Sequence, residues 1–478
     1  MAGRGLNREG RHNTYYGDAG AFCEMDHKFR AGCMQNVNRT FMQAQQCPLV
    51  TAVRVMQSIH NSVIIAHAPL GCAGGMAMEN GNVKLYRAMT GAPHENSRIL
   101  STNLDERDII MGGEDKLRRA IGEAVRRYDP EVISIMMSCA SGIIGDDVEA
   151  VIEEMQPGLK AVLVPVFCEG FRSKIPITGS DVAFHGIQRY LFRDIHPVRQ
   201  DNLVNVIILP TCGALDRAYL TEMLAALGLE ANFLPFAGSL ADFRRMASAR
   251  VSTSICSAFA DDLLAYLQRT YDIPYTRFVL PIGSEETDEW LRGIAREVGR
   301  EPEAEAYLTR ERAKYMPKIR EIRQRIRGKR VVITTNLMRS LSNVALARDF
   351  GFEVVAVQTA LYDDFLSDEL TKLSDTFGPE TLLTLNGAQA YEQANLIRKL
   401  DADLFLGMGV DQARRQGVPA VFQVDRKDVT FGYRGLASLA VKLADALDNP
   451  NFVKKLAAHK KLPYRDAWYA ENAFKYIV

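Results

Sequence analysis

The chain has 478 residues, of which 47% are apolar and 24% charged, a composition typical of a soluble globular protein with about two to four domains. Lysine and arginine together number 58, as do aspartate and glutamate, so the zero net charge provides no basic field for nucleic acid or an anionic membrane. No apolar run approaches the roughly 18 residues that a membrane-spanning helix requires.

Residues 1–40 are polar, and they carry Cys23 and Cys33 in a stretch that we expect to be irregular and able to wrap around a neighbouring chain. The first twenty residues lack the apolar stretch of a signal peptide. We therefore expect a cytoplasmic protein, in which disulfides are rare and thiols are free to bind metal.

From about Cys47 onward, strand-like and helix-like segments alternate. The predicted strands are Ser62–Pro69, Glu131–Met137, Leu159–Phe167, Leu203–Leu209, Arg330–Thr335, Glu353–Val357 and Leu404–Leu406. The predicted helices include Glu114–Tyr128 and Asp146–Met155. This alternation predicts parallel sheets covered by helices.

A charged run, Arg310–Lys329, predicts an amphipathic helix that is interrupted by Pro317 and ends at Gly328. Its basic residues fit a solvated helix face better than a nucleic-acid site. Fresh series of strands and helices begin near residues 200 and 329. We therefore predict domains over 41–200, 201–328 and 329–440, flanked by an N-terminal extension (1–40) and a C-terminal helix and tail (441–478).

Three thiols carry most of the chemical information. Cys72 and Cys139 each follow a predicted buried strand, and each precedes a glycine-bearing turn. Ligands bind at the carboxyl ends of parallel strands, and iron–sulfur clusters are held mainly by cysteine. With Cys47 the set is one short of four, so either the fourth ligand is not a cysteine or it belongs to another chain. The alternative is that these are ordinary buried thiols; the chain has no CxxC pair for a zinc ribbon or a thioredoxin-type motif.

Several segments, in matching order and spacing from about residue 45 to 455, resemble the D-type (alpha) subunit of nitrogenase component 1. His67–Cys72 (HAPLGC) is similar to that family's HGPVGC segment, and Glu106–Leu117 (ERDIIMGGEDKL) to its EKDIVFGGDKKL stretch. Ile143–Val151 follows the third thiol as in the family, and Cys168–Arg172 reproduces its CEGFR pentapeptide. The series is more specific than any one of its members.

The resemblance implies an α/β fold of three Rossmann-like domains with parallel sheets flanked by helices. It implies a homologous K-type (beta) partner subunit in a D2K2 heterotetramer. Cys47, Cys72 and Cys139 would then bind a P-cluster-type iron–sulfur cluster shared with that partner. Cys256 matches the cysteine that binds a large nitrogenase-type iron–sulfur cofactor, whose heterometal the sequence does not specify. Cys168 is implied to be structural, and Cys23, Cys33 and Cys212 match no role.

The resemblance also implies a transient electron donor, an ATP-dependent 4Fe-4S reductase homodimer. This chain has no GxxxxGK[ST] loop, so the ATP site must lie on that other protein.

The chain departs from the family at its metal-binding histidine. In the family a histidine in a YHGFDG-like segment binds the distal metal of the cofactor, but Phe431 stands at that position here. Phenylalanine cannot bind a metal. A later histidine, His459, lies in a lysine-rich stretch and is expected to be exposed.

Further departures concern the residues around the cofactor. Gly179-Ser180-Asp181 replaces the family's GHH segment, which leaves Ser180 and His185 as candidate catalytic residues. His185 lies one helical turn past Asp181, and a structural role on an amphipathic helix is the favoured alternative for it. Arg339 is a further candidate that would line the pocket, although a surface position is equally compatible with its loop. The family's arginine after the second thiol becomes Asn80 or a near neighbour.

These departures argue against a standard nitrogen-fixing alpha subunit. The retained thiols argue against the protochlorophyllide and chlorophyllide reductases, which bind a tetrapyrrole. We expect the catalytic D subunit of a nitrogenase-like methylthio-alkane reductase, which cleaves small thioethers such as 2-(methylthio)ethanol or dimethyl sulfide to methanethiol and a hydrocarbon. The alternatives are a cofactor-assembly scaffold, an alternative nitrogenase alpha subunit, and a protein whose domains bind a small organic ligand.

Overall fold

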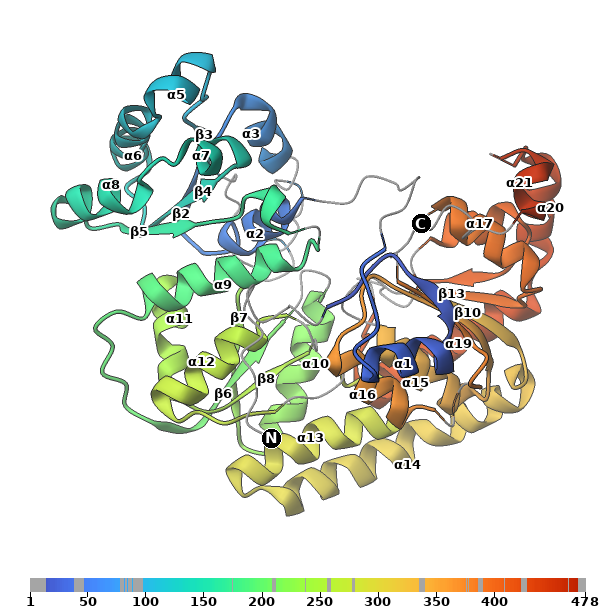
Figure 1. Cartoon of the computed structure of the whole chain (residues 1–478). Helices are drawn as coiled ribbons and strands as arrows, with labels where there is room; N and C mark the ends of the chain where they lie inside the picture. The colour runs from blue at the N-terminus through green and yellow to red at the C-terminus, as the bar shows by residue number, and fades with distance from the viewer. Residues whose placement is uncertain are drawn as a thin grey trace. The chain divides into compact units, whose positions relative to one another are not determined.

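The computed structural model describes residues 14–37, 47–77, 81, 84, 88, 98–173, 175–208, 212–236, 238–255, 259–276, 280–334, 340–374, 376, 378–385, 390–407, 409–422, 428–462 and 464–471. Their strands form three sheets, all of them parallel apart from one edge strand, and helices flank the sheets (Figure 1). The predicted α/β fold class is therefore confirmed. The chain divides into two compact units, one built mainly from residues 45–210 and 228–277, the other from 11–44, 211–227 and 278–478.

The first unit contains two four-stranded parallel sheets. The sheet that comes first in the chain has the order β3-β2-β4-β5, with strands β2 (Ser62–His67), β3 (Ile99–Ser101), β4 (Val132–Met137) and β5 (Val162–Val166). Strands β2 and β4 are almost entirely buried, as expected for strands covered on both faces. The accompanying helices are α2 (Pro48–Met56), α3 (Leu70–Ala77), α5 (Glu106–Met111), α6 (Glu114–Tyr128), α7 (Cys139–Ile144), α8 (Val148–Met155) and the 3₁₀ turns η2 (Gln156–Gly158) and η3 (Gly170–Arg172).

The other sheet of this unit has the order β7-β6-β8-β9, with strands β6 (Gln200–Ile207), β7 (Glu230–Leu234), β8 (Ala249–Ser254) and β9 (Tyr275–Thr276). Helices α11 (Leu240–Arg245) and α12 (Asp261–Tyr271) and the 3₁₀ turn η4 (Met246–Ser248) pack beside it. Helix α9 (Thr178–Leu191) joins the two halves, since it packs on β5 and its Gln188 Nε2 donates to Asp262 Oδ2 of α12 at 2.7 Å.

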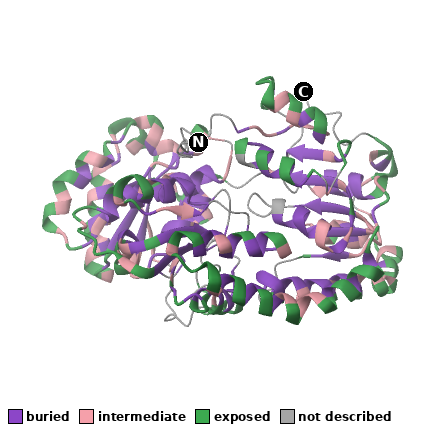
Figure 2. Ribbon diagram, turned by 90° about the horizontal axis from the view of Figure 1, so that it is seen from below, coloured by how far each residue is buried: buried purple, intermediate pink, exposed green. Residues whose placement is uncertain are grey.

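The second unit is built on a six-stranded sheet of order β1-β12-β11-β10-β13-β14. Its strands are β1 (Ala19–Ala21), β10 (Arg330–Thr334), β11 (Glu353–Thr359), β12 (Leu382–Leu385), β13 (Leu404–Gly407) and β14 (Ala420–Val421). Its helices are α1 (Phe22–Arg30), α10 (Ala214–Ala225), α13 (Ser284–Val298), α14 (Glu301–Ile326), α15 (Ser340–Phe350), α16 (Asp364–Lys372), α17 (Ala390–Lys399), α18 (Val410–Arg415), α19 (Gly432–Asp448), α20 (Asn451–His459) and α21 (Asp466–Ala470). The strands carry the core, as Figure 2 shows by their purple colour.

The N-terminal segment is more regular than the sequence suggests. Residues 19–21 form β1, which pairs antiparallel with β12, and helix α1 follows directly. Asp26 accepts hydrogen bonds of 2.7 Å from Tyr362 and Ser367, and the Phe29 ring meets the Tyr362 ring edge-on. The expectation of irregular structure is wrong for these residues, because their few apolar and aromatic side chains find partners far along the same chain.

The charged helix is longer than predicted. Helix α14 begins at Glu301 and runs through Pro317 to Ile326. Proline removes one backbone hydrogen bond but leaves the buried face, with Ile319 and Ile322, intact. None of the helices in the described parts of the chain is long and apolar enough to cross a membrane.

Candidate metal centre

Two of the three candidate thiols stand at one edge of the first sheet. Cys72 is the third residue of α3, shortly after β2, and Cys139 is the first residue of α7, shortly after β4. Strands β2 and β4 are parallel neighbours, so their carboxyl ends lie side by side. Cys47 is the residue that precedes helix α2, with Pro48 in the first helical position.

The structure places short helices where glycine-bearing turns are predicted after the strands. Ser138 caps α7: its backbone N–H donates to Ser141 Oγ at 2.9 Å, and its own Oγ accepts from the Ser141 N–H. Gly145, with a φ of +79°, ends the helix in the left-handed region that glycine tolerates. The prediction missed these helices because the caps act over only a few residues and the helices themselves are short.

Two of the candidate sulfurs, Cys47 Sγ and Cys139 Sγ, lie beside Gly170. A Cβ atom added to Gly170 would lie 2.8 Å from Cys47 Sγ and 3.6 Å from Cys139 Sγ. The Cys47 sulfur therefore leaves no room for a side chain at this position of the CEGFR segment, and the Cys139 sulfur would lie at ordinary contact distance from one. The neighbouring Glu169 packs against Gly142, in the helix of Cys139, and forms a 3.0 Å ion pair with Arg172. The sequence predicts a role for the CEGFR segment only through its resemblance to the family and does not predict this proximity. The one local indication is a glycine shortly after a predicted strand.

Burial and mutual repulsion shape the electrostatics of the thiols. Cys47 is exposed as a residue, but the protein atoms around its sulfur partly desolvate it and so raise the pKa of Cys47; a negative charge on Cys139 would raise it further. Partial desolvation likewise raises the pKa of Cys72, which is also exposed as a residue, and negative charges on Cys139 and Cys47 would raise it further. A negative charge on Cys139 thus disfavours the thiolate forms of both Cys47 and Cys72. A bound metal would offset this cost, since metal binding requires the thiolate form.

Cys168 is a different kind of thiol. It is buried, and its Sγ donates to the Met137 carbonyl at 3.2 Å. Burial raises the pKa of Cys168 well above its ordinary value, so it remains protonated. Within the described parts of the chain, no three cysteine, histidine or acidic side chains converge closely enough to hold a single metal ion. Cys47, Cys72 and Cys139 therefore do not form a site for a single metal ion.

Exposed apolar side chains surround the thiols. Leu70 on α3, Ile143 on α7 and Phe171 on η3 are exposed by 65%, 73% and 55% respectively. Ile110 and Met111, on the helix after β3, are exposed as well. All four connections at this edge of the sheet thus present large apolar groups to solvent, which is typical of an interaction surface.

The candidate residues of helix α9 do not converge. Ser180 is fully buried, and its Oγ has no hydrogen-bond partner among the described residues. His185 is exposed, and five residues along a helix place it about 140° around the axis from Ser180. Gly179 meets helix α2 instead: an added Cβ would lie 1.9 Å from the Pro48 carbonyl oxygen.

Phe431 is fully buried in the second unit, directly before α19. The backbone around it is tied down, since Thr430 N donates to Asp216 Oδ1 at 2.6 Å and Gly432 N donates to the Pro281 carbonyl at 2.8 Å. The ring is therefore part of the core.

Several other predicted positions have simpler outcomes. Cys256, Arg339 and Asn80 lie outside the described residues. His459 is exposed, as expected, and Nδ1 lies 2.8 Å from the Lys455 carbonyl. Cys23 and Cys33 are exposed, whereas Cys212 is buried.

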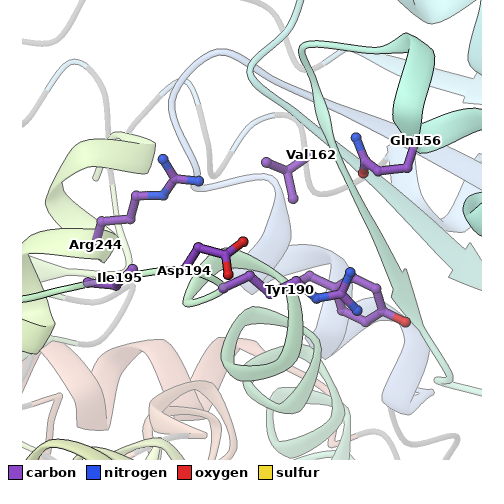
Figure 3. Close-up of a pocket in the computed structure, with 7 residues that line it drawn as sticks. Gln156, Val162, Tyr190, Asp194, Ile195 and Arg244 are labelled. Atoms are coloured by element: carbon purple, nitrogen blue, oxygen red, sulfur yellow. The ribbon is translucent and has the colours of Figure 1, made fainter.

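A cavity of about 500 Å³ in the first unit contains none of these candidates (Figure 3). Tyr190 and Arg244 line it, together with Gln156. The amide of Gln156 is already bonded to the Ala161 carbonyl and the Leu163 N–H at 2.9 Å each. This cavity is therefore not part of the thiol site.

Comparison with known proteins gives a consistent result. Residues 47–448 match the model of the family described as nitrogenase component 1 type oxidoreductase. The chain is 24% identical over 421 residues to the nitrogenase iron-molybdenum cofactor biosynthesis protein NifE of Nostoc sp., covering 84% of this chain and 82% of the relative. It is 24% identical over 412 residues to the nitrogenase molybdenum-iron protein alpha chain of Azotobacter vinelandii, with the same coverage.

A solved structure, "Nitrogenase Cp1 at pH 5", superposes with a TM-score of 0.70 over 90% of this chain and 93% of that one. Because the sequence identity is only 20%, this similarity supports the fold and not a function.

Proposed function

Because this chain belongs to the family of nitrogenase component 1 type oxidoreductases, we propose that it is the catalytic D-type subunit of a complex that reductively cleaves the C–S bond of small methylthio-alkanes. In the reaction, two electrons and two protons convert dimethyl sulfide to methanethiol and methane. Two electrons and two protons likewise convert 2-(methylthio)ethanol to methanethiol, ethylene and water.

The gathering of Cys47, Cys72 and Cys139 around one sheet edge is the observation that carries this proposal. The position of Cys47 Sγ leaves no room for a side chain at Gly170, and Cys139 Sγ lies nearby, as we expect of a closely packed cluster site. Exposed Leu70 and Ile143 beside the thiols fit burial by a second subunit, which would supply the remaining ligands. We infer a homologous K-type partner in a D2K2 assembly.

The residues of this chain then have separate roles. The three thiols would hold a P-cluster-type cluster and Cys256 a larger iron–sulfur cofactor; together these groups would supply electrons at low potential. A transient ATP-dependent 4Fe-4S reductase would deliver those electrons. The apolar side chains around the thiols would exclude water from the bound cluster, which tunes its potential.

Phe431 and Ser180 favour a substrate other than dinitrogen. The family's metal-binding histidine is replaced by Phe431, whose ring has no lone pair and lies in the core. Ser180 stands within the segment that replaces the family's GHH motif, and it is buried too. A chain without these two imidazoles fits a reaction that does not require them.

The second candidate function is a scaffold for cofactor assembly. Its support is the similarity to NifE of Nostoc sp., which covers 84% of this chain. A scaffold would hold a precursor cluster for transfer and would not turn over a thioether.

A headspace assay distinguishes the two functions. The chain is purified anaerobically with its partner subunit and given the ATP-dependent reductase, ATP and dithionite, in separate vials with 2-(methylthio)ethanol, dimethyl sulfide or dinitrogen. Methanethiol with ethylene or methane, and no ammonia, is the expected result. Ammonia would make the chain an alternative nitrogenase subunit. Bound iron and sulfide without any product would favour the scaffold.

A variant links the assay to this chain. Cys256→Ala should keep the spectrum of the edge cluster, the cluster that Cys47, Cys72 and Cys139 would hold at the sheet edge. It should abolish turnover, because only the larger cofactor would lose its ligand. Cys33→Ala, at an exposed thiol without a proposed role, is the matched control and should retain full activity. Normal turnover in Cys256→Ala would contradict the assignment of Cys256 as a ligand of the larger cofactor.

A further inference from the structure

A buried carboxylate joins the segments that carry Cys72 and Cys139. Asp146 lies seven residues after Cys139, and His67 lies five residues before Cys72. His67 Nε2 and Asp146 Oδ2 are 2.8 Å apart, and their side chains are only 0% and 1% exposed. We propose that Asp146 is a positioning residue that fixes the separation of the Cys72 and Cys139 thiols. The nature of the group that the thiols hold rests on the proposed function.

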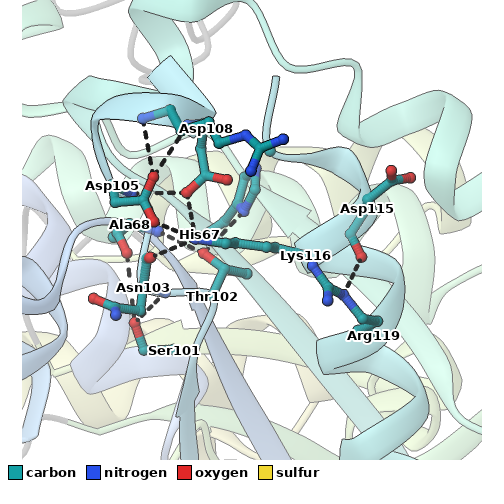
Figure 4. Close-up of polar contacts among 12 residues, drawn as sticks. His67, Ala68, Ser101, Thr102, Asn103, Asp105, Asp108, Asp115, Lys116 and Arg119 are labelled. Carbon is teal, nitrogen blue, oxygen red and sulfur yellow. Dashed lines mark hydrogen bonds and ion pairs between the residues drawn. The ribbon is translucent and has the colours of Figure 1, made fainter. Parts of the chain in front are cut away.

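The hydrogen bonds of His67 have a definite direction. Burial lowers the pKa of His67 and outweighs the opposing effect of Asp146, so the ring is neutral. A neutral imidazole donates from one nitrogen and accepts at the other, and a carboxylate only accepts. Nε2–H therefore donates to Asp146. Nδ1 accepts from Thr102 Oγ1 at 3.2 Å, and that oxygen accepts in turn from the Ala68 N–H (Figure 4).

The second oxygen of Asp146 holds a third segment. Oδ1 accepts from the Gly113 N–H at 2.8 Å, directly before α6 and close to the end of α5. A Cβ added to Gly113 would lie 2.6 Å from Leu104 and 2.8 Å from Asp146 Oδ2, so the backbone approaches as only glycine allows. One carboxylate thus ties the end of β2 to the connections that follow β3 and β4.

Substitution of Asp146 separates position from charge. In Asp146→Asn, the amide oxygen can accept from Gly113, and the amide nitrogen can donate to His67 Nε2 once the histidine proton moves to Nδ1. Nδ1–H then donates to Thr102 Oγ1, which turns its own proton to the Ala66 carbonyl 3.3 Å away. Every hydrogen bond is rebuilt without the charge. Asp146→Ala leaves two buried donors without partners.

The first readout uses the metal-free full-length chain. In a Cys47→Ala background, Cys72 and Cys139 are joined by a short bifunctional alkylating reagent, and the linked peptide is quantified by mass spectrometry. We expect a several-fold lower yield in Asp146→Ala and an unchanged yield in Asp146→Asn. Asp147→Ala is the matched control, because this neighbouring carboxylate is exposed and caps α8. If Asp146→Ala lacks a cooperative thermal transition, Thr102→Val is used as the test variant in its place. It removes the hydroxyl that bonds His67 Nδ1 and the Ala68 N–H, so it should also lower the yield of the linked Cys72–Cys139 peptide.

The second readout uses the complex purified anaerobically with its partner. Asp146→Ala should shift the midpoint potential and change the electron paramagnetic resonance spectrum of the edge cluster, whereas Asp146→Asn and Asp147→Ala should match the wild type. Wild-type cross-linking and spectra in Asp146→Ala would overturn the proposal, as would an equal loss in Asp146→Asn. Absence of any cluster from the wild-type complex would refute the proposed function, while the cross-linking yields would still decide the role of Asp146.

Discussion

Gly170 is a residue whose lack of a side chain has a direct chemical consequence. Gly170→Ala would put a Cβ 2.8 Å from Cys47 Sγ and 3.6 Å from Cys139 Sγ, which displaces at least one thiol. We expect the complex to lose most of the iron bound at the sheet edge, measured as iron per chain after anaerobic purification.

The control for this substitution is Gly122→Ala on α6. No atom lies within 4 Å of a Cβ at Gly122, so alanine should raise the unfolding free energy by about 0.5–1 kcal/mol and leave the iron content unchanged. Full iron occupancy in Gly170→Ala would show that the glycine contact is not needed.

Glu286 should make the stability of the second unit depend on pH. Burial raises the pKa of Glu286 from 4.5 to about 7, despite its 2.7 and 2.8 Å contacts with Arg348. The folded state then binds more protons than the unfolded state between these values, so stability present below about pH 4.5 is lost as the pH rises through about 7. The shift corresponds to a loss of up to about 3 kcal/mol. Glu286→Gln should remove this part of the pH dependence when thermal unfolding is compared at pH 5 and pH 8. An equal change of the thermal midpoint between pH 5 and pH 8 in the two proteins would contradict the raised pKa of Glu286.

Local sequence patterns predicted the candidate thiols but not the residues that surround them. Cys72 and Cys139 stand out because a buried strand, a thiol and glycines follow one another within a few residues. Gly170 and Asp146 act through contacts with residues some tens to more than a hundred positions away. Such contacts have no local signal, so only the folded chain reveals them.

At the scale of elements, the close packing of α2 against α9 positions Cys47. Gly179→Ala would force a Cβ to 1.9 Å from the Pro48 carbonyl, one residue after the thiol. We expect a loss of about 1–3 kcal/mol of unfolding free energy, as is usual for overpacked contacts. Iron content should fall together with the thermal midpoint.

Gly158→Ala provides the comparison, because nothing lies within 4 Å of a Cβ at that position. It should leave both the thermal midpoint and the iron content near the wild-type values. A normal thermal midpoint in Gly179→Ala would mean that α9 can shift without cost.

The elements that the sequence predicts well are those with a long apolar signal. Helix α6 has the predicted bounds, and β4 begins one residue later than predicted. The short α7 and β1 were missed, because α7 depends on a serine cap and β1 on a distant pairing partner. Helix α14 exceeded its prediction because buried residues before Arg310, such as Leu308, extend its apolar face.

At the scale of the whole molecule, the thiol-bearing edge should bind the partner subunit. Ile143→Ser would remove an exposed apolar group from this surface without opening a cavity. We expect weaker association with the partner, measured by analytical ultracentrifugation, and an unchanged thermal midpoint of the isolated chain. Val198→Ser, at an equally exposed site in the connection before β6, should leave association unchanged. Equal weakening by both substitutions would argue against this surface.

The N-terminal strand should protect the edge of the large sheet in the second unit. A chain without residues 1–37 would expose the backbone groups of β12 that β1 occupies. Exposed strand edges pair with other chains, so we expect aggregation detected by light scattering at micromolar concentration. A chain without residues 1–13 retains β1 and should remain dispersed. Equal behaviour of the two shortened chains would contradict this role of β1.

The pairing of β1 with β12 also sets an order of events during synthesis. Residues 19–21 leave the ribosome early, but their partners at 382–384 are made more than three hundred residues later. The first unit is complete once residue 277 has emerged, so we expect it to fold while the rest of the chain is still being made. The early segment must wait unpaired for that time. The surface that carries Cys72 and Cys139 is thus formed before the nascent chain can complete the sheet of the second unit.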